Sequence, residues 1–165
     1  MSPQLVFLHG LESEPGGSKF LTLQSLGLGD VLEPDCSKLI VPDDRFRIVE
    51  AALAGHQRLV LVGSSFGGLM ALKFAAAHPE QVAAMVLCAP AVHREERGWT
   101  PPAMTLPIPV RILQGTRDDI VPLTAVEAYC MANGLPLTVV DDNHRLSASH
   151  DVMAQLVREV WKMVA

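Results

Sequence analysis

One short segment constrains the fold of this 165-residue chain more than any other. The largely apolar run at 58–62 leads directly into Gly63-Ser64-Ser65-Phe66-Gly67, and an apolar stretch of helical character follows at 69–77. A buried strand must therefore reverse into a helix within about one residue. Such a turn forces its middle residue into strained backbone angles, and flanking glycines allow the close backbone approach. The segment predicts that Ser65 stands at the tip of the turn, at the carboxyl edge of a sheet.

Strand-like and helix-like stretches alternate along the chain. This alternation predicts a three-layer α/β/α sandwich, an open and mainly parallel sheet with helices on both faces. About six strands are expected, at residues 5–9, 37–41, 58–63, 83–88, 109–114 and 137–141. Helices are expected at 17–26, 44–55, 66–78, 122–133 and 149–164. With 49% hydrophobic and 19% charged residues, the chain is expected to form a single domain over residues 1–165.

Two further polar residues come after strand-like runs of their own. Asp118 follows the run at 110–115, and His144 follows the run at 137–140. Because the carboxyl ends of parallel strands meet at one edge of the sheet, we expect both side chains near Ser65. A hydroxyl, an imidazole and a carboxylate in sequence form a nucleophile, its base and the group that orients the base.

These motifs together resemble the α/β-hydrolase superfamily, in particular its small, nearly capless bacterial esterase and thioesterase branch. The resemblance rests on the opening Phe7-Leu8-His9-Gly10-Leu11-Glu12-Ser13, on G-x-S-x-G, on G-x-x-D-x-x-V-P at 115–122 and on the late loop histidine. It runs from Leu5 to the final helix. It implies a trimmed α/β-hydrolase fold with a minimal cap, a short flap at about 90–106.

The resemblance also implies a reaction. Ser65 would be the nucleophile, His144 its base and Asp118 the acid that orients the histidine. The backbone N–H groups of Leu11 and Phe66 would form the oxyanion hole. His9, Gly10, Gly63 and Gly67 are expected to support these loops. The implied activity is hydrolysis of a carboxylic ester or thioester of a small acyl substrate, with no metal and no organic cofactor.

Several residues compete with these assignments. Ser64 precedes the predicted nucleophile, Asp119 follows the predicted acid, and His150 opens the next helix; their plainer interpretations are packing, a solvated turn and a surface position. Trp99 and Met104, on the flap, either form one wall of an acyl pocket or anchor the flap to the body.

Other functions use the same residues. A serine amidase or peptidase needs the same triad, and a catalytically idle scaffold that binds a partner or small ligand would share the fold. The net charge of −5 and the scattered basic residues argue against nucleic acid as a partner. The glycines and serines in 59–77, together with Lys73, argue against membrane insertion.

Cysteine content and the first residues bear on location. Three cysteines without C-x-x-C spacing are typical of reduced thiols. Only about five apolar residues precede His9, too few for a signal peptide. We therefore expect a mature, cytoplasmic protein. The sequence carries no signal of oligomeric state.

Overall fold

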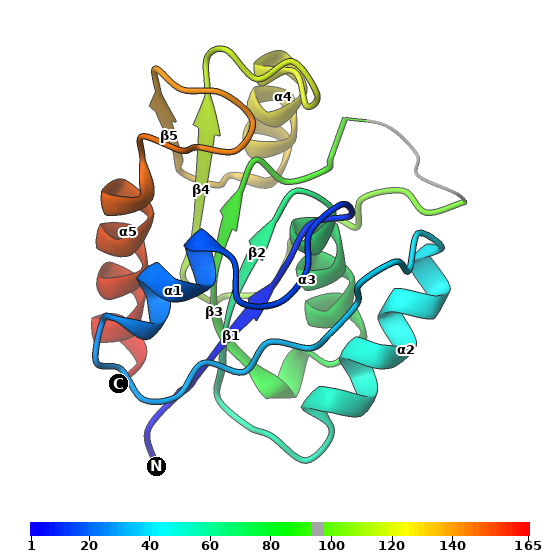
Figure 1. Cartoon of the computed structure of the whole chain (residues 1–165), viewed down its shortest axis with the longest axis vertical. Helices are drawn as coiled ribbons and strands as arrows, with labels where there is room; N and C mark the ends of the chain where they lie inside the picture. Colours follow the sequence, from blue (N-terminus) through cyan, green and yellow to red (C-terminus); the bar gives the residue numbers. More distant parts are fainter. Residues whose placement is uncertain (94–97) are drawn as a thin grey trace.

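The structure, a computed structural model, describes residues 1–93 and 98–165. Its centre is a parallel sheet in which sequence order and spatial order coincide (Figure 1). The strands are β1 (Gln4–Leu8), β2 (Leu59–Ser64), β3 (Val82–Cys88), β4 (Val110–Gly115) and β5 (Leu137–Val140). Because all five run the same way, the loops that follow them gather at one edge.

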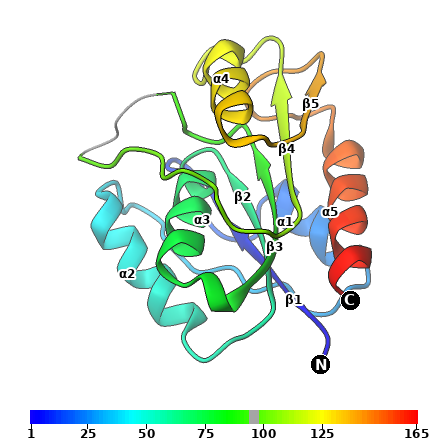
Figure 2. The same cartoon turned by 180° about the vertical axis from the view of Figure 1, so that it is seen from behind.

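Helices cover both faces of the sheet, as Figures 1 and 2 show from opposite sides. They are α1 (Ser18–Gln24), α2 (Pro42–Leu53), α3 (Phe66–Ala77), α4 (Leu123–Asn133) and α5 (His150–Val164), with a 3₁₀ turn at Pro79–Gln81. Residues of α2, α3 and α4 share one buried apolar cluster, whereas residues of α1 and α5 belong to a second cluster on the opposite face. The predicted three-layer sandwich is confirmed.

The helices on the two faces of the sheet differ in how much of their own surface is buried. In α3 most residues are buried, because this helix lies against β1, β2 and β3 and is covered in turn by α2. In α5 the buried residues recur at helical spacing, as in an amphipathic helix with one face in solvent. Helix α4 ends at Gly134, whose left-handed conformation (φ 62°) closes the last turn.

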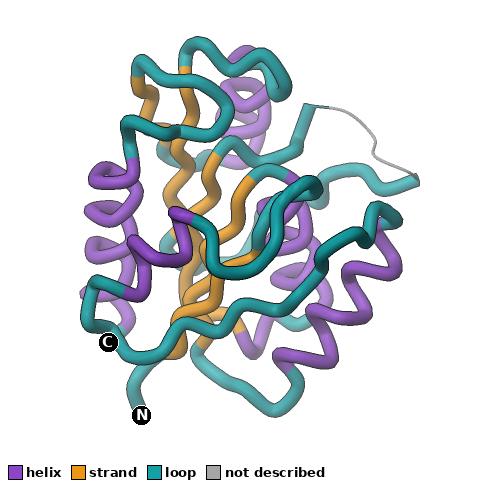
Figure 3. The backbone as a smooth tube through the Cα atoms, in the orientation of Figure 1, coloured by secondary structure: helices purple, strands orange, loops and turns teal. Residues whose placement is uncertain are grey.

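The predicted strand at 37–41 is wrong, so the described part of the sheet has five strands and not about six. Ser37 and Lys38 form a turn, with Lys38 at a positive φ of 66°, and Pro42 already starts α2. The loop drawn in Figure 3 before α2 instead runs along β1, where Leu32 alone bridges to Val6. The carbonyl of Leu39 accepts a hydrogen bond from Arg45 Nε (2.6 Å), so it is not available to a neighbouring strand.

The described helices do not include one that is long and apolar enough to cross a membrane. The apolar stretch at 59–77 is divided between β2 and α3, with the turn at Ser65 between them. The stretch is apolar because β2 and most of α3 are buried in the interior of the fold.

Candidate active site

The three residues predicted to act together lie on three different loops at the carboxyl edge of the sheet. Ser65 follows β2, Asp118 follows β4 and His144 follows β5. The Oγ atom of Ser65 is 3.0 Å from His144 Nε2, and His144 Nδ1 is 2.8 Å from Asp118 Oδ2. One continuous chain of hydrogen bonds thus links His144 to Asp118, 26 positions earlier in the sequence, and to Ser65, 79 positions earlier.

The backbone of Ser65 is strained and firmly held. Its angles are φ 54° and ψ −113°, a conformation that residues other than glycine rarely adopt. Its N–H donates to Cys88 O (2.9 Å), and its carbonyl accepts from the N–H groups of Gly68 and Ala91 (2.9 and 3.0 Å). Bonds on both sides therefore fix the turn and offset the strain, as is common at functional sites.

Gly63 and Gly67 are required by close contact of backbones. A Cβ atom on Gly63 would lie 2.6 Å from Gly67 O, and one on Gly67 would lie 2.0 Å from Leu8 O. Both distances are too short for any side chain. These glycines let the start of α3 press against β1 and β2, which places the turn at Ser65.

Asp118 holds its position through both carboxylate oxygens, and its side chain is 0% exposed. The Oδ1 atom accepts from the N–H groups of Ile120 and Val121 (2.9 and 2.7 Å), while Oδ2 accepts from Gln114 Nε2 (3.1 Å) and faces His144 Nδ1. A carboxylate can only accept, so Nδ1 of His144 carries the proton. The Nε2 atom is then free to accept the hydroxyl proton of Ser65.

The loop that carries His144 is organised by a second aspartate. Asp142, 2% exposed, accepts from Asn143 N–H (2.7 Å), Ala148 N–H (2.9 Å) and the Ser149 hydroxyl (2.7 Å). Burial acts to raise its pKa, but these three hydrogen bonds outweigh it and hold the pKa below the usual range. From the other side, Lys19 Nζ donates to Arg145 O (2.7 Å), which ties the loop to α1.

The residues predicted for the oxyanion hole lie beside Ser65. Phe66 is the first residue of α3, where a backbone N–H has no acceptor within the helix. Leu11 lies in the turn after β1, closed by a bond from Ser13 N–H to Gly10 O (3.3 Å). Both residues line the same cleft as Ser65 and His144.

His9 is buried next to these groups and its tautomer follows from its partners. Its Nε2 accepts from Cys36 N–H (3.0 Å), so Nδ1 carries the proton and donates to Gly10 O (2.9 Å). Burial lowers the pKa of His9, and the charge of Arg45 lowers it further. The histidine is therefore neutral near pH 7 and braces the loop, in line with its predicted supporting place.

Ser65 lines a cleft of about 1070 Å³, and most of the residues that line this cleft are polar. Lys19, Lys38 and Arg145 bring positive charge to it, and Glu12 and Glu14 bring negative charge. Of the competing residues, Ser64 and His150 also line the cleft, but the hydroxyl that lies within hydrogen-bond distance of His144 Nε2 is that of Ser65. Asp119 is exposed beside the buried Asp118.

Trp99 and Met104 do not line this cleft, so they do not form the wall of an acyl pocket there. Trp99 donates to Asp43 Oδ1 (2.8 Å) and packs edge-on against Phe46 at 5.4 Å between ring centroids. Met104 is buried in the core, and its N–H donates to Asn133 Oδ1 (2.8 Å). Both anchor the flap to the helices. Residues 94–97 of the predicted flap lie outside the described residues.

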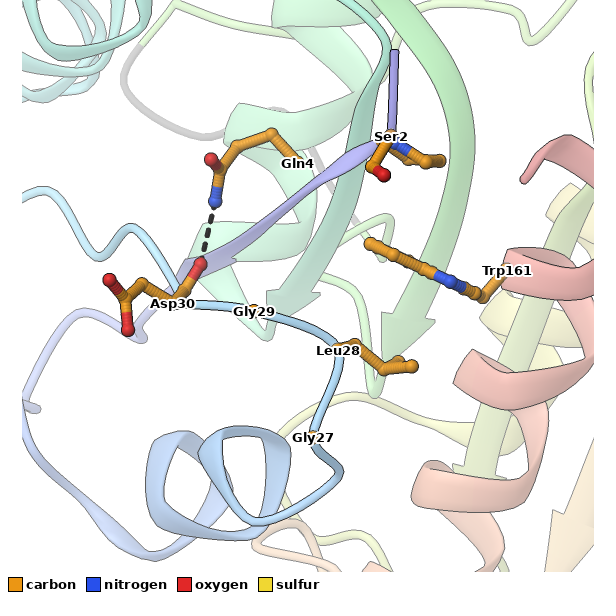
Figure 4. Close-up of a pocket in the computed structure, with 8 residues that line it drawn as sticks. Ser2, Gln4, Gly27, Leu28, Gly29, Asp30 and Trp161 are labelled. Atoms are coloured by element: carbon orange, nitrogen blue, oxygen red, sulfur yellow. Dashed lines mark hydrogen bonds between the residues drawn. The ribbon is translucent and has the colours of Figure 1, made fainter.

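A smaller pocket of about 360 Å³ lies at the opposite end of β1, near the chain termini. Figure 4 shows the indole of Trp161 between Ser2 and Leu28, with Gln4 Nε2 donating to Asp30 O (2.7 Å). Among the described residues that line it, Asp30 alone is charged, and the pocket shares no lining residue with the cleft at Ser65. It therefore offers no chemistry comparable to that of the large cleft.

Residues 1–93 and 98–165 contain no group of three or more His, Cys, Asp or Glu side chains that could bind a metal ion. The three cysteines are free and buried. Burial raises the pKa of the Cys88 thiol to about 11, which keeps it protonated and unreactive at neutral pH.

Three residues that position the site were missed by sequence reasoning. Gln114, at the buried end of β4, holds both Asp118 and the carbonyl of Val121 (2.9 Å). Asp142 orders the histidine loop, and Arg45 reaches the loop after β1 from α2. Gln114 lies near the end of β4 and Asp142 just after β5, and a polar residue at the end of an apolar strand can be recognised in the sequence as a candidate site residue. Arg45 lies in a helical stretch with several charged residues, and nothing in the sequence distinguishes it from them.

Comparison with known proteins bears on the family and the fold. Residues 41–106, which include Ser65 but neither Asp118 nor His144, match the family described as serine aminopeptidase, S33. No curated protein sequence matches the chain.

Solved structures resemble the whole chain at low identity. Alpha/beta hydrolase domain-containing protein 10 from mouse is 19% identical with a TM-score of 0.82, and the match covers 100% of this chain and 92% of that one. An alpha/beta hydrolase enzyme from the sediment metagenome of the Mar Chica lagoon, Morocco, is 21% identical with a TM-score of 0.77, covering 98% and 91%. The thioesterase domain from the curacin biosynthetic pathway is 11% identical with a TM-score of 0.75, covering 95% and 91%. The chain therefore has the α/β-hydrolase fold in a small form, and the resemblance stated from the sequence is confirmed at the level of the fold.

Proposed function

We propose that the protein is a serine hydrolase that cleaves a carboxylic ester or thioester of a small acyl group through an acyl-enzyme on Ser65. The observation that carries the proposal is the unbroken hydrogen-bond chain from Ser65 Oγ through His144 to the buried carboxylate of Asp118. A serine that merely closes a turn needs neither a strained φ nor a histidine held by a carboxylate.

The first half of the reaction forms the acyl-enzyme. Ser65 Oγ attacks the carbonyl carbon while its proton passes to His144 Nε2, and Asp118 stabilises the resulting imidazolium. The carbonyl oxygen becomes negative and accepts from the N–H groups of Leu11 and Phe66. Oxyanion donors of this kind contribute about 3 to 4 kcal/mol each to transition-state stabilisation. The alcohol or thiol then leaves with the proton from Nε2.

The second half uses the same groups with water as the nucleophile. His144 takes a proton from water, the hydroxide attacks the acyl carbon, and the acid is released as Ser65 Oγ regains its proton. The positive end of α3 points at the developing oxyanion in both halves, because Phe66 begins that helix.

The surroundings of the serine support a small acyl group. The second part of the flap is held against the helices by the contacts of Trp99 with α2 and of Met104 with α4, whereas Ala91 at its start lines the cleft. Polar residues outnumber apolar ones in the lining of the cleft, and only a short apolar set is available to an acyl chain: Phe7, Leu11, Phe66, Ala91 and Ile120. This set favours a short acyl chain attached to a polar alcohol or thiol over a long lipid. The structural likeness to a thioesterase domain is the reason to include thioesters.

Labelling with a fluorophosphonate probe tests the proposal, with hydrolysis of short-chain p-nitrophenyl esters measured beside it. Wild type is expected to label and turn over, and Ser65→Ala and His144→Ala to do neither. Ser64→Ala is the matched control and should retain both. A parallel acyl thioester and an acyl p-nitroanilide separate thioesterase from amidase activity, and we expect the ester and thioester to be cleaved faster.

One result would replace the proposal by another. If the folded wild type neither labels nor turns over any of the three substrate types, the triad is not functional, and the cleft then serves an idle scaffold that binds a ligand.

A further inference from the structure

Arg45 is the largest fully buried side chain among residues 1–93 and 98–165, and it is charged. It is 1% exposed and lies on α2, behind the loop that follows β1. Among the described residues no carboxylate lies within ion-pair distance of it, and its guanidinium rests over the ring of Phe66 at 5.3 Å. A buried arginine without an acid is costly unless its N–H groups are satisfied.

Backbone carbonyls of consecutive residues satisfy it. Arg45 Nη1 donates to His9 O (3.0 Å), and Nη2 donates to Gly10 O (2.8 Å) and Leu11 O (3.3 Å). Its Nε donates to Leu39 O, in the loop before α2. One planar group therefore fixes three successive carbonyls of the loop that carries Leu11.

The bond to Gly10 O has a direct consequence for the Leu11 N–H. The two groups belong to the same peptide unit, and in a planar trans peptide the N–H points opposite to the C=O. Arg45 Nη2, His9 Nδ1 and, at 3.3 Å, the Ser13 N–H all donate to this carbonyl. The two side chains thus set the direction of the Leu11 N–H together with the turn itself. A cationic donor on the carbonyl also polarises the peptide and strengthens its N–H as a donor.

We propose that Arg45 is a positioning residue of the oxyanion hole, which clamps the Gly10–Leu11 peptide so that the Leu11 N–H faces the oxyanion formed at Ser65. The inference rests on the proposed function. Its contact with Phe66, which supplies the second N–H, makes Arg45 a neighbour of both halves of the hole. Such a residue acts on the transition state and leaves substrate binding nearly unchanged.

Two substitutions separate charge from shape. Arg45→Lys keeps the positive charge but replaces the three donating nitrogens of the guanidinium by one, and Arg45→Gln keeps an amide donor without the charge. We expect both to lower kcat by about 10²-fold or more, the loss typical of one oxyanion donor, with KM of a p-nitrophenyl ester changed less than about twofold. Arg58→Gln is the matched control, because Arg58 also donates to two backbone carbonyls, those of Met1 and Val164, at the far end of the sheet.

A transition-state analogue supplies a readout that a purely structural role would not move. An aryl trifluoromethyl ketone adds Ser65 Oγ to its carbonyl carbon, its oxygen becomes the oxyanion, and the serine proton passes to His144. Its inhibition constant should rise in the Arg45 variants in proportion to the loss of kcat/KM, while that of the matching methyl ketone stays constant. Circular dichroism and urea unfolding identify the folded variants.

Three outcomes overturn the inference. The first is a folded Arg45 variant whose kcat stays within about threefold of wild type. The second is an equal loss in Arg58→Gln. The third is a rise of both inhibition constants together. If wild type itself fails to label with fluorophosphonate, the proposed function has failed, and that result is distinct from an active wild type with active Arg45 variants.

Discussion

At the scale of single residues, Asp118 carries the sharpest prediction. Each of its two carboxylate oxygens accepts two hydrogen bonds. In Asp118→Asn one of these oxygens is replaced by an NH₂ group, which cannot accept and faces the groups that donated to the oxygen. Nδ1 of His144 then loses its acceptor, and the wrong tautomer becomes favoured. We expect kcat/KM to fall by about 10³-fold or more. Ester hydrolysis by Asp119→Asn is the control, because that neighbouring carboxylate is exposed, and equal losses in both variants would contradict the assignment.

The glycines at the turn give a prediction on stability. A methyl group on Gly67 would meet Leu8 O at 2.0 Å, so Gly67→Ala must push β1 and α3 apart. We expect the free energy of unfolding in urea to fall by about 3 kcal/mol, the upper end of what overpacking usually costs. Gly17→Ala serves as the comparison, since its methyl group would approach only Glu14 O, at 4.0 Å, and φ there is −72°. Equal stability of the two variants would show that the turn is not tightly packed.

At the scale of elements, the sequence predicts what depends on local patterns. Of the six strands expected from the alternation of strand-like and helix-like runs, five lie close to observed strands, and the five expected helices lie close to observed helices. The loop positions of Ser65, Asp118 and His144 follow from them. The strand expected at 37–41 fails because tertiary contacts decide that segment: Arg45 takes the carbonyl of Leu39. Arg45 itself was not predictable, since helical periodicity cannot show which polar residue is drawn inward by carbonyls from a distant loop.

The loop between β5 and α5 gives a prediction at this scale. Asp142→Asn weakens three hydrogen bonds to a buried carboxylate, and we expect the free energy of unfolding at neutral pH to fall by about 2 kcal/mol. Because folding lowers the pKa of Asp142, this contribution is present above the ordinary value of 3.8 and is lost as pH falls through the folded-state value. Urea unfolding at several pH values checks the trend. Asp141→Asn is the control, since the partners of that exposed carboxylate, Arg117 and Thr116, are exposed as well, and we expect little change.

At the scale of the whole molecule, burial leaves several titratable groups uncharged. Burial lowers the pKa of His9 and His150, with Arg45 and Lys19 lowering them further. Burial raises the pKa of the Cys88 and Cys130 thiols to about 11. The fold therefore loses stability whenever the pH favours the charged form of these groups in the unfolded chain.

The sign of each shift fixes the shape of the stability curve. The two histidines take up protons more readily when unfolded, so stability is lost as pH falls from 6.5 towards their folded-state values. The thiols lose protons more readily when unfolded, so stability is lost as pH rises from 9.0 towards about 11. We expect the free energy of unfolding to be greatest between these limits when it is measured by urea titration across the range.

Two variants test whether His9 causes the loss of stability at acidic pH (the acidic limb of the curve) and Cys88 the loss at alkaline pH (the alkaline limb). His9→Gln keeps a donor for Gly10 O and an acceptor for Cys36 N–H without titrating, so the acidic limb should become shallower. Cys88→Ala removes a buried thiol, so the alkaline limb should become shallower although the variant is less stable at every pH. Because a cavity or a lost contact shifts stability equally across pH, only the change of slope counts. Unchanged slopes in both variants would place the titrating groups elsewhere in the fold.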